Sequence, residues 1–74
     1  MMPTTRFPGI DTALAAQIDR VFATVGQGFN PYLEVRRRRR ELVFLNSLTD
    51  AELDRLGLRR DLIAMHVFRY LLGL

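Results

Sequence analysis

The side chains with the clearest chemistry are five consecutive arginines, Arg36, Arg37, Arg38, Arg39 and Arg40. A guanidinium group is always charged at neutral pH, and its planar fork of N–H donors matches a phosphate or a carboxylate. Counting Glu34 and Glu41, this window has an excess of three positive charges, which equals the net charge of +3 of the whole chain. The positive charge is therefore concentrated in one short patch, and this indicates an anionic partner.

The other polar side chains argue against an enzyme. The chain has one His (His66), one Ser (Ser47) and no Cys, so the usual pairs of nucleophile and base cannot be assembled. The carboxylates of Asp50, Glu52 and Asp54 are explained by their place at the start of a predicted helix. His66 has no second metal ligand near it in the sequence, so we expect no metal and no cofactor.

The chain length limits how the protein can be stabilised. Its 74 residues are enough for one small domain, and such a chain buries only about 60 % of its unfolded surface. Without cysteines or a metal site, helix packing or self-association must supply the stability. No apolar stretch approaches the roughly 18 residues of a membrane span, and no signal peptide is apparent. We therefore expect a cytoplasmic protein and no membrane association.

The first 30 residues contain one strong helical pattern. Residues 1–9, with two prolines and one glycine, are typical of a flexible N-terminal arm. Residues 10–30 predict an amphipathic helix and a linker. Asp11 or Thr12 can cap this helix. Its apolar stripe comprises Leu14, Ile18, Val21, Phe22 and Val25.

A second helix, from about Pro31 to Asn46, should hold the arginine run. Val35, Leu42 and Leu45 fall within one arc at about 100° per residue. Leu33 and Phe44 lie on the opposite side, so either this helix has neighbours on two faces or these two residues meet a partner.

The same periodicity divides the arginines into two groups. Arg38 and Arg39 border the apolar arc, so their aliphatic stems should lie along apolar surface. Arg36, Arg37 and Arg40 point away from the arc and remain available for an anion.

A short third helix is marked at both ends. Thr49 and Glu52 have the spacing of a capping box, in which each side chain accepts a hydrogen bond from a free backbone N–H. Gly57 can supply the left-handed residue that ends the helix. We expect this segment to be helical between residues 49 and 57.

The last helix, from about Arg60 to Leu72, has almost no polar face. A helix that is apolar all round is normally buried, yet so small a protein has little mass with which to cover it. One alternative is a central core helix. The other is a partner or dimer interface formed by Phe68, Tyr70, Leu71 and Leu72. Together the patterns predict an all-α fold, a small bundle of three to four short helices with an arginine-rich second helix and an apolar C-terminal helix.

The order Arg40-Glu41-Leu42, Leu45, Leu48, Thr49-Asp50-x-Glu52-Leu53, Leu56-Gly57-Leu58 and Arg60-x-x-Ile63 resembles the YjiS-like domain. This is a family of very short bacterial proteins of poorly defined function that is abundant in α-proteobacteria. The resemblance covers roughly residues 32 to 64 and predicts a YjiS-like domain over residues 31–74. It implies a non-catalytic regulator of metabolism, stress or RNA turnover, with Arg36 to Arg40 contacting RNA. The bulky residues after Ile63 depart from the family pattern.

Two functions remain open, and a third is less favoured. In the first, the arginine run binds RNA electrostatically, and Tyr32, one turn before the run, could stack on a base. In the second, the protein is an adaptor whose apolar C-terminal helix docks on a protein while the arginines contact its acidic rim. The third is a peripheral membrane binder with the arginines at anionic headgroups and Phe68, Tyr70, Leu71 and Leu72 inserted; against it, these two sets of residues lie on different predicted helices. The sequence identifies no target for any of these functions and no oligomeric state.

Overall fold

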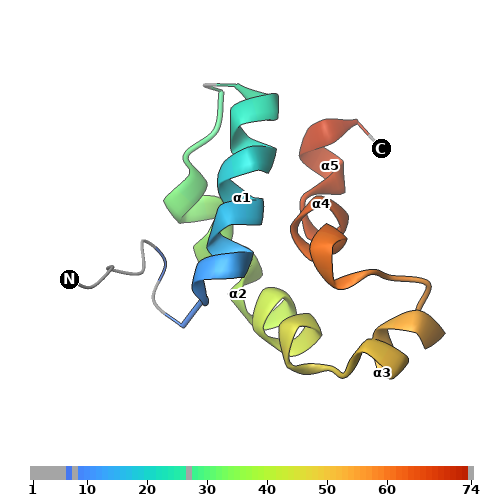
Figure 1. The fold of residues 1–74 in the computed structure, drawn as a ribbon. Coiled ribbons are helices and arrows are strands. Elements are labelled where there is room, and N and C mark those ends of the chain that lie inside the picture. Colours follow the sequence, from blue (N-terminus) through green and yellow to red (C-terminus); the bar gives the residue numbers. More distant parts are fainter. Residues whose placement is uncertain (1–6, 8, 27, 74) are drawn as a thin grey trace.

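The protein is an all-α bundle in the computed structural model, which describes residues 7, 9–26 and 28–73 (Figure 1). No strand occurs in this part of the chain. The elements are α1 (Thr12–Val25), α2 (Pro31–Ser47), α3 (Asp50–Arg55), a turn of 3-10 helix (Arg60–Leu62), α4 (Ile63–Val67) and α5 (Arg69–Leu72). The predicted fold class is confirmed.

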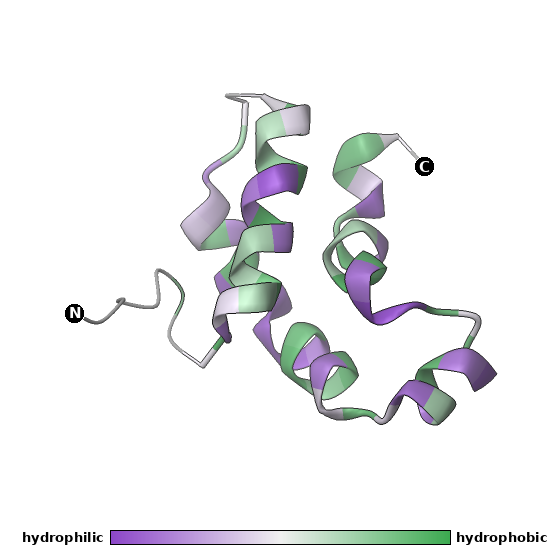
Figure 2. Ribbon diagram, viewed as in Figure 1, coloured by the Kyte–Doolittle hydropathy of each residue, from purple (hydrophilic) through white to green (hydrophobic). Residues whose placement is uncertain are grey.

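Helix α1 lies in front of α2 in the view of Figure 1 and packs against α4, which α2 also contacts. It begins where the sequence predicts, because the Asp11 carboxylate accepts a hydrogen bond of 2.8 Å from the N–H of Leu14. Its ribbon alternates between hydrophobic and hydrophilic colours in Figure 2, as expected for a helix with one buried face. Four residues of the predicted stripe are buried: Leu14, Ile18, Val21 and Phe22.

Helix α2 begins at a side-chain cap and at a proline. The Asn30 side chain accepts hydrogen bonds from the N–H groups of Tyr32 and Leu33, and Pro31 occupies the first turn, where no N–H is needed. The predicted inner arc of Val35, Leu42 and Leu45 is buried. Both ends of α2 agree with the sequence-based prediction to within one residue.

Helix α3 confirms the capping box. The Thr49 hydroxyl accepts a hydrogen bond of 3.1 Å from the N–H of Glu52, and the Glu52 carboxylate accepts one of 2.8 Å from the N–H of Thr49. Gly57 has φ of 76°, and the following N–H of Leu58 donates back to the carbonyl of Leu53 at 2.9 Å. This left-handed turn closes the helix and buries Leu53 in the core.

The C-terminal helix is broken, which corrects the prediction of one helix from Arg60 to Leu72. The break lies at Phe68, where φ is −101° and ψ is 21°. The Arg69 guanidinium donates a hydrogen bond of 2.6 Å to the carbonyl of His66, in the place where a continuous helix would use a backbone N–H. A side chain that enters the hydrogen-bond ladder is a common cause of a helix kink.

The N-terminal arm is also corrected where the structure describes it. Phe7 is only 2 % exposed, and Ile10 is equally buried. Residues 1–6 and 8 of the predicted flexible arm lie outside the described residues. Phe7 and Ile10 are therefore docked on the bundle, and α1, α2 and the C-terminal helices share one hydrophobic cluster with them.

Candidate nucleic-acid interface

The buried inner face of α2 decides where the arginine run lies. Helix α2 packs against α4 through this face. Because successive residues of an α-helix turn by about 100°, Arg36, Arg37 and Arg40 are directed away from the core. All five arginines of the run are exposed. The side chains proposed from the sequence to contact an anion are thus presented on the outer sides of one helix.

Few acidic groups neutralise this surface. Arg37 lies 3.8 Å from the Glu34 carboxylate, at the long end of the range for an ion pair. Within the described residues, no carboxylate forms an ion pair with Arg36, Arg39 or Arg40. Arg36 and Arg40 are one helical turn apart, a spacing at which like charges repel. The outer side of α2 therefore holds positive charge that the fold does not balance.

Arg38 has a different environment from its neighbours. Its guanidinium carbon lies over the Tyr70 ring, 4.7 Å from the ring centroid, in the geometry of a cation–π contact. This agrees with the expectation that Arg38 lies along apolar surface. Arg38 thus links the arginine helix to α5 and contributes to folding as well as to the charge of the surface.

Tyr70 and Glu34 form the second link between α2 and α5. The Tyr70 hydroxyl donates a hydrogen bond of 2.6 Å to the Glu34 carboxylate, and Glu34 is only 8 % exposed. Burial raises the pKa of Tyr70, the bond to Glu34 acts in the same direction, and Arg38 opposes both. Glu34 is therefore already held by Tyr70 and Arg37.

Arg39 and Arg40 border an open hollow between α2 and the segment before α1. The hollow has a volume of about 560 Å³ and is lined by Gly9, Arg39, Arg40, Val43 and Phe44. Gly9 has φ of 81°, and a Cβ atom in its place would overlap the Arg39 guanidinium. The positive φ favours a glycine here, whereas the exposed Arg39 side chain could move away from a Cβ atom.

The most exposed aromatic residue on this surface is Phe44, and not Tyr32, which the sequence suggested for stacking. Tyr32 is exposed, but its ring packs against Phe7 with centroids 5.3 Å apart. Phe44 is 59 % exposed, and within the described residues it makes no ring contact. Helical periodicity already placed Leu33 and Phe44 opposite the inner arc of α2. Both are exposed, so within the described residues this side of α2 is not covered and stays available for a partner.

The predicted partner interface in the C-terminal helix is corrected by the burial of its residues. Phe68 is 0 % exposed and makes an edge-to-face contact with Phe22, with centroids 5.1 Å apart. Leu71 and Leu72 are half-buried against the core, and Tyr70 is exposed but holds Glu34 and Arg38. Phe68 is a core residue and cannot serve as a docking surface in this fold.

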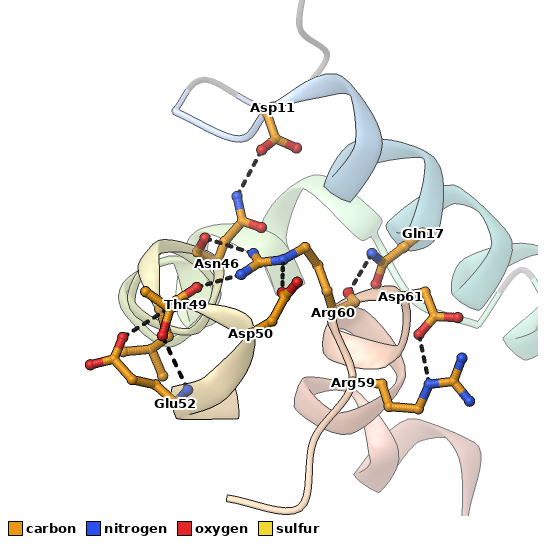
Figure 3. Close-up of polar contacts among 10 residues, drawn as sticks. Asp11, Gln17, Asn46, Thr49, Asp50, Glu52, Arg59, Arg60 and Asp61 are labelled. Atoms are coloured by element: carbon orange, nitrogen blue, oxygen red, sulfur yellow. Dashed lines mark hydrogen bonds and ion pairs between the residues drawn. The ribbon is translucent and has the colours of Figure 1, made fainter. Parts of the chain in front are cut away.

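Arg60 fixes the far end of α2 (Figure 3). Its guanidinium donates to the Asp50 carboxylate at 2.8 Å, to the carbonyl of Asn46 at 3.1 Å and to the carbonyl of Leu48. These two carbonyls belong to the last turn of α2 and its cap, where a positive charge is also favoured by the helix dipole. Arg60 is therefore a structural residue that holds the arginine helix in place.

The described residues contain no group of three or more His, Asp and Glu side chains that could hold a metal ion. Among the same residues, no helix has both the length and the apolar character needed to cross a membrane.

Comparison of the chain with models of known protein families, with curated proteins and with solved structures gave no match.

Proposed function

We propose that this protein is a small, non-catalytic regulator that binds RNA electrostatically through the outer side of α2. The observation that supports this most directly is the pair Arg36 and Arg40, which is exposed and has no carboxylate partner among the described residues. Arg37 lies beside them and is only loosely paired with Glu34. Three forked donors on one helical face can contact several phosphates of a backbone at once. A single small anion would use fewer of them.

An anionic ligand would also remove a repulsion between arginines that destabilises α2. Like charges one turn apart destabilise an isolated helix by about 0.2–0.5 kcal/mol for each pair. Phosphates between Arg36 and Arg40 would remove this repulsion and release counterions. The resemblance to the YjiS-like domain adds RNA as the expected polyanion and regulation as the expected role, and it stays a prediction.

The test replaces Arg36, Arg37 and Arg40 together by Gln. Arg38 and Arg39 stay unchanged, because Arg38 contacts Tyr70 and Arg39 lies against Gly9. For three phosphate contacts, the wild-type affinity for RNA should fall with salt at a log–log slope of about −2. The triple variant should bind more weakly and lose most of this slope. Filter binding between about 50 and about 300 mM salt measures both quantities.

A matched control removes the same charge elsewhere. Arg20, Arg55 and Arg59 are exposed and lie outside α2, so their replacement by Gln changes the net charge equally. The control variant should keep the wild-type slope. If both triple variants lose affinity equally, the binding is a property of net charge and not of α2. If wild type and the α2 variant give the same curves, the RNA proposal is wrong.

The adaptor function remains the second candidate because of a different surface. Leu62 and Met65 are exposed large apolar side chains, and they line a hollow of about 280 Å³ that also includes Arg59 and Arg69. Such a rim of arginines around apolar residues suits an acidic amphipathic helix. This surface replaces the one predicted around Phe68. Replacing Leu62 and Met65 by Ser should abolish capture of a protein partner and leave RNA binding unchanged.

A further inference from the structure

The hollow beside Arg39 and Arg40 has a composition that the charge of α2 alone does not explain. Its lining includes Arg39 and Arg40, neither of which has an ion-pair partner in the described part of the chain. It also includes Val43 and Phe44, both exposed. An aromatic ring next to unpaired arginines is the combination that proteins use to hold a nucleotide, with the base on the ring and the phosphate on the arginine.

The position of Phe44 continues the line of arginines along α2. Arg36, Arg40 and Phe44 are each separated by four residues, so each lies about 6 Å further along the helix at a rise of about 1.5 Å per residue. All three face the same side of the helix. A strand whose phosphates contact Arg36 and Arg40 is therefore led towards the Phe44 ring.

The chemistry of stacking selects among the forms of RNA. A base can lie on an aromatic side chain only when it is unstacked from its neighbours, as in a single strand, a loop or a bulge. In an A-form duplex the bases are paired and stacked within the helix, and only the backbone and the groove edges are offered to a protein. Phe44 would therefore contribute to the binding of a single strand and not of a duplex.

We infer that the hollow formed by Arg39, Arg40 and Phe44 receives one unstacked base of single-stranded RNA and its phosphate. This inference rests on the proposed function and adds to it a preference for single-stranded RNA over duplex. Phe44 is the residue that determines the preference, and Gly9 lines the hollow beside Arg39.

The first experiment compares Phe44→Ala with wild type on an oligouridine single strand and on an RNA duplex of the same length. Wild type should prefer the single strand, and Phe44→Ala should lose about fivefold or more of single-strand affinity, the lower limit for one stacked base. Its salt slope and its affinity for the duplex should stay unchanged. Phe29→Ala is the matched control, because Phe29 is also exposed but lies before α2 and away from the hollow.

The second experiment does not depend on a loss of affinity. The chain contains no Trp, so Phe44→Trp introduces a single indole that preserves an aromatic surface. Its fluorescence should be quenched when the oligouridine binds and should change little with the duplex. Phe29→Trp, measured in the same way, should respond to neither.

The outcomes separate this inference from the function on which it rests. Suppose that the α2 arginine variant loses RNA binding, but Phe44→Ala binds as wild type does and the Trp at position 44 is not quenched. The proposed function then stands and the base site is wrong. Equal loss in Phe29→Ala and Phe44→Ala also overturns the base site, because the effect would not be confined to the hollow. If the arginine variant retains full binding, both proposals fail.

Discussion

The hydroxyl of Tyr70 and the carboxylate of Glu34 are joined by a hydrogen bond of 2.6 Å across 36 residues of sequence. This bond ties α5 to the start of the arginine helix. The bond uses one carboxylate oxygen, and Arg37 lies 3.8 Å from the other. Glu34 therefore contacts both α5 and the arginine run.

Tyr70→Phe should destabilise the protein by about 1–3 kcal/mol, because it leaves the buried Glu34 carboxylate without its closest donor. Chemical denaturation at neutral pH measures the change. Tyr32→Phe is the control, since the Tyr32 ring packs on Phe7 and no hydrogen bond of its hydroxyl occurs within the described residues. Equal stability of the two variants would show that the bond between Tyr70 and Glu34 contributes nothing.

Arg60→Lys should cost about 1–3 kcal/mol, although it keeps the charge, because an ammonium group cannot reach Asp50 and two carbonyls at once. Arg59→Lys provides the comparison. Arg59 pairs with Asp61 at 3.4 Å, and the two side chains are 73 % and 65 % exposed, so this change should cost less than about 0.5 kcal/mol. Thermal melts of both variants at the same salt concentration check the difference. Similar melts would contradict the structural role of Arg60.

Thr49→Ala should cost about 1 kcal/mol by removing half of the capping box, which is about 4–8 °C in melting temperature for a domain of this size. Gly57→Val should cost more, since a β-branched residue resists the positive φ at this position. A Cβ at Gly57 meets no atom within 4 Å, so the cost is conformational. Gly28→Ala, also in open space but without a positive φ, should change the melting temperature little.

Stability should decrease in acid because of Asp11. Hydrogen bonds from the N–H of Leu14 and then from the Asn46 amide lower the pKa of Asp11 below its usual value of 3.8. A group whose pKa is lowered in the folded state stabilises the protein at pH above its unfolded-state pKa. This stability is lost as the pH falls through the folded-state pKa. Asp11→Asn can still cap α1 and should show a smaller loss of stability below about pH 4. Urea denaturation of both proteins across this range tests the assignment.

Tyr70 makes the stability of the fold depend on pH in the alkaline range. Its raised pKa means that the folded state holds the phenol proton more tightly than the unfolded chain does. The stability from the bond to Glu34 is complete below about pH 10, the ordinary value for tyrosine, and is lost as the pH rises through the folded-state pKa. Tyr70→Phe should remove this alkaline decrease, which a denaturation series at rising pH would reveal.

Local patterns were sufficient for the elements that carry their own start and stop signals. The Asp11 cap, the inner arc of α2 and the capping box of α3 all depend on residues within about three helical turns of one another. The division of the arginines also followed from helical periodicity. The structure places Arg38 over an aromatic ring. It leaves all five arginines exposed, Arg39 included, so exposure alone does not separate the two predicted groups.

The features that the sequence did not predict depend on contacts between distant residues. At the break, Phe68 contacts Phe22 in the core and the Arg69 side chain donates to the carbonyl of His66; helical periodicity predicted neither contact. The docking of Phe7 depends on Tyr32, which lies 25 positions away along the printed sequence. The hollow beside Phe44 needs Gly9 from a different segment. Such tertiary contacts override what a short window of sequence favours.

The Gln17 side chain joins α1 to the start of α4. Its amide group donates a hydrogen bond of 2.9 Å to the carbonyl of Arg60, and its oxygen accepts one of 3.1 Å from the N–H of Ala64. Gln17 thus stands in for a peptide group that the start of α4 lacks. A fragment that begins at Pro31 would keep every arginine of the run but lose both bonds and the apolar face of α1. We therefore expect residues 31–74 alone to be less stable than the whole bundle, because α1 is as much a part of the scaffold as the helix that presents the arginines.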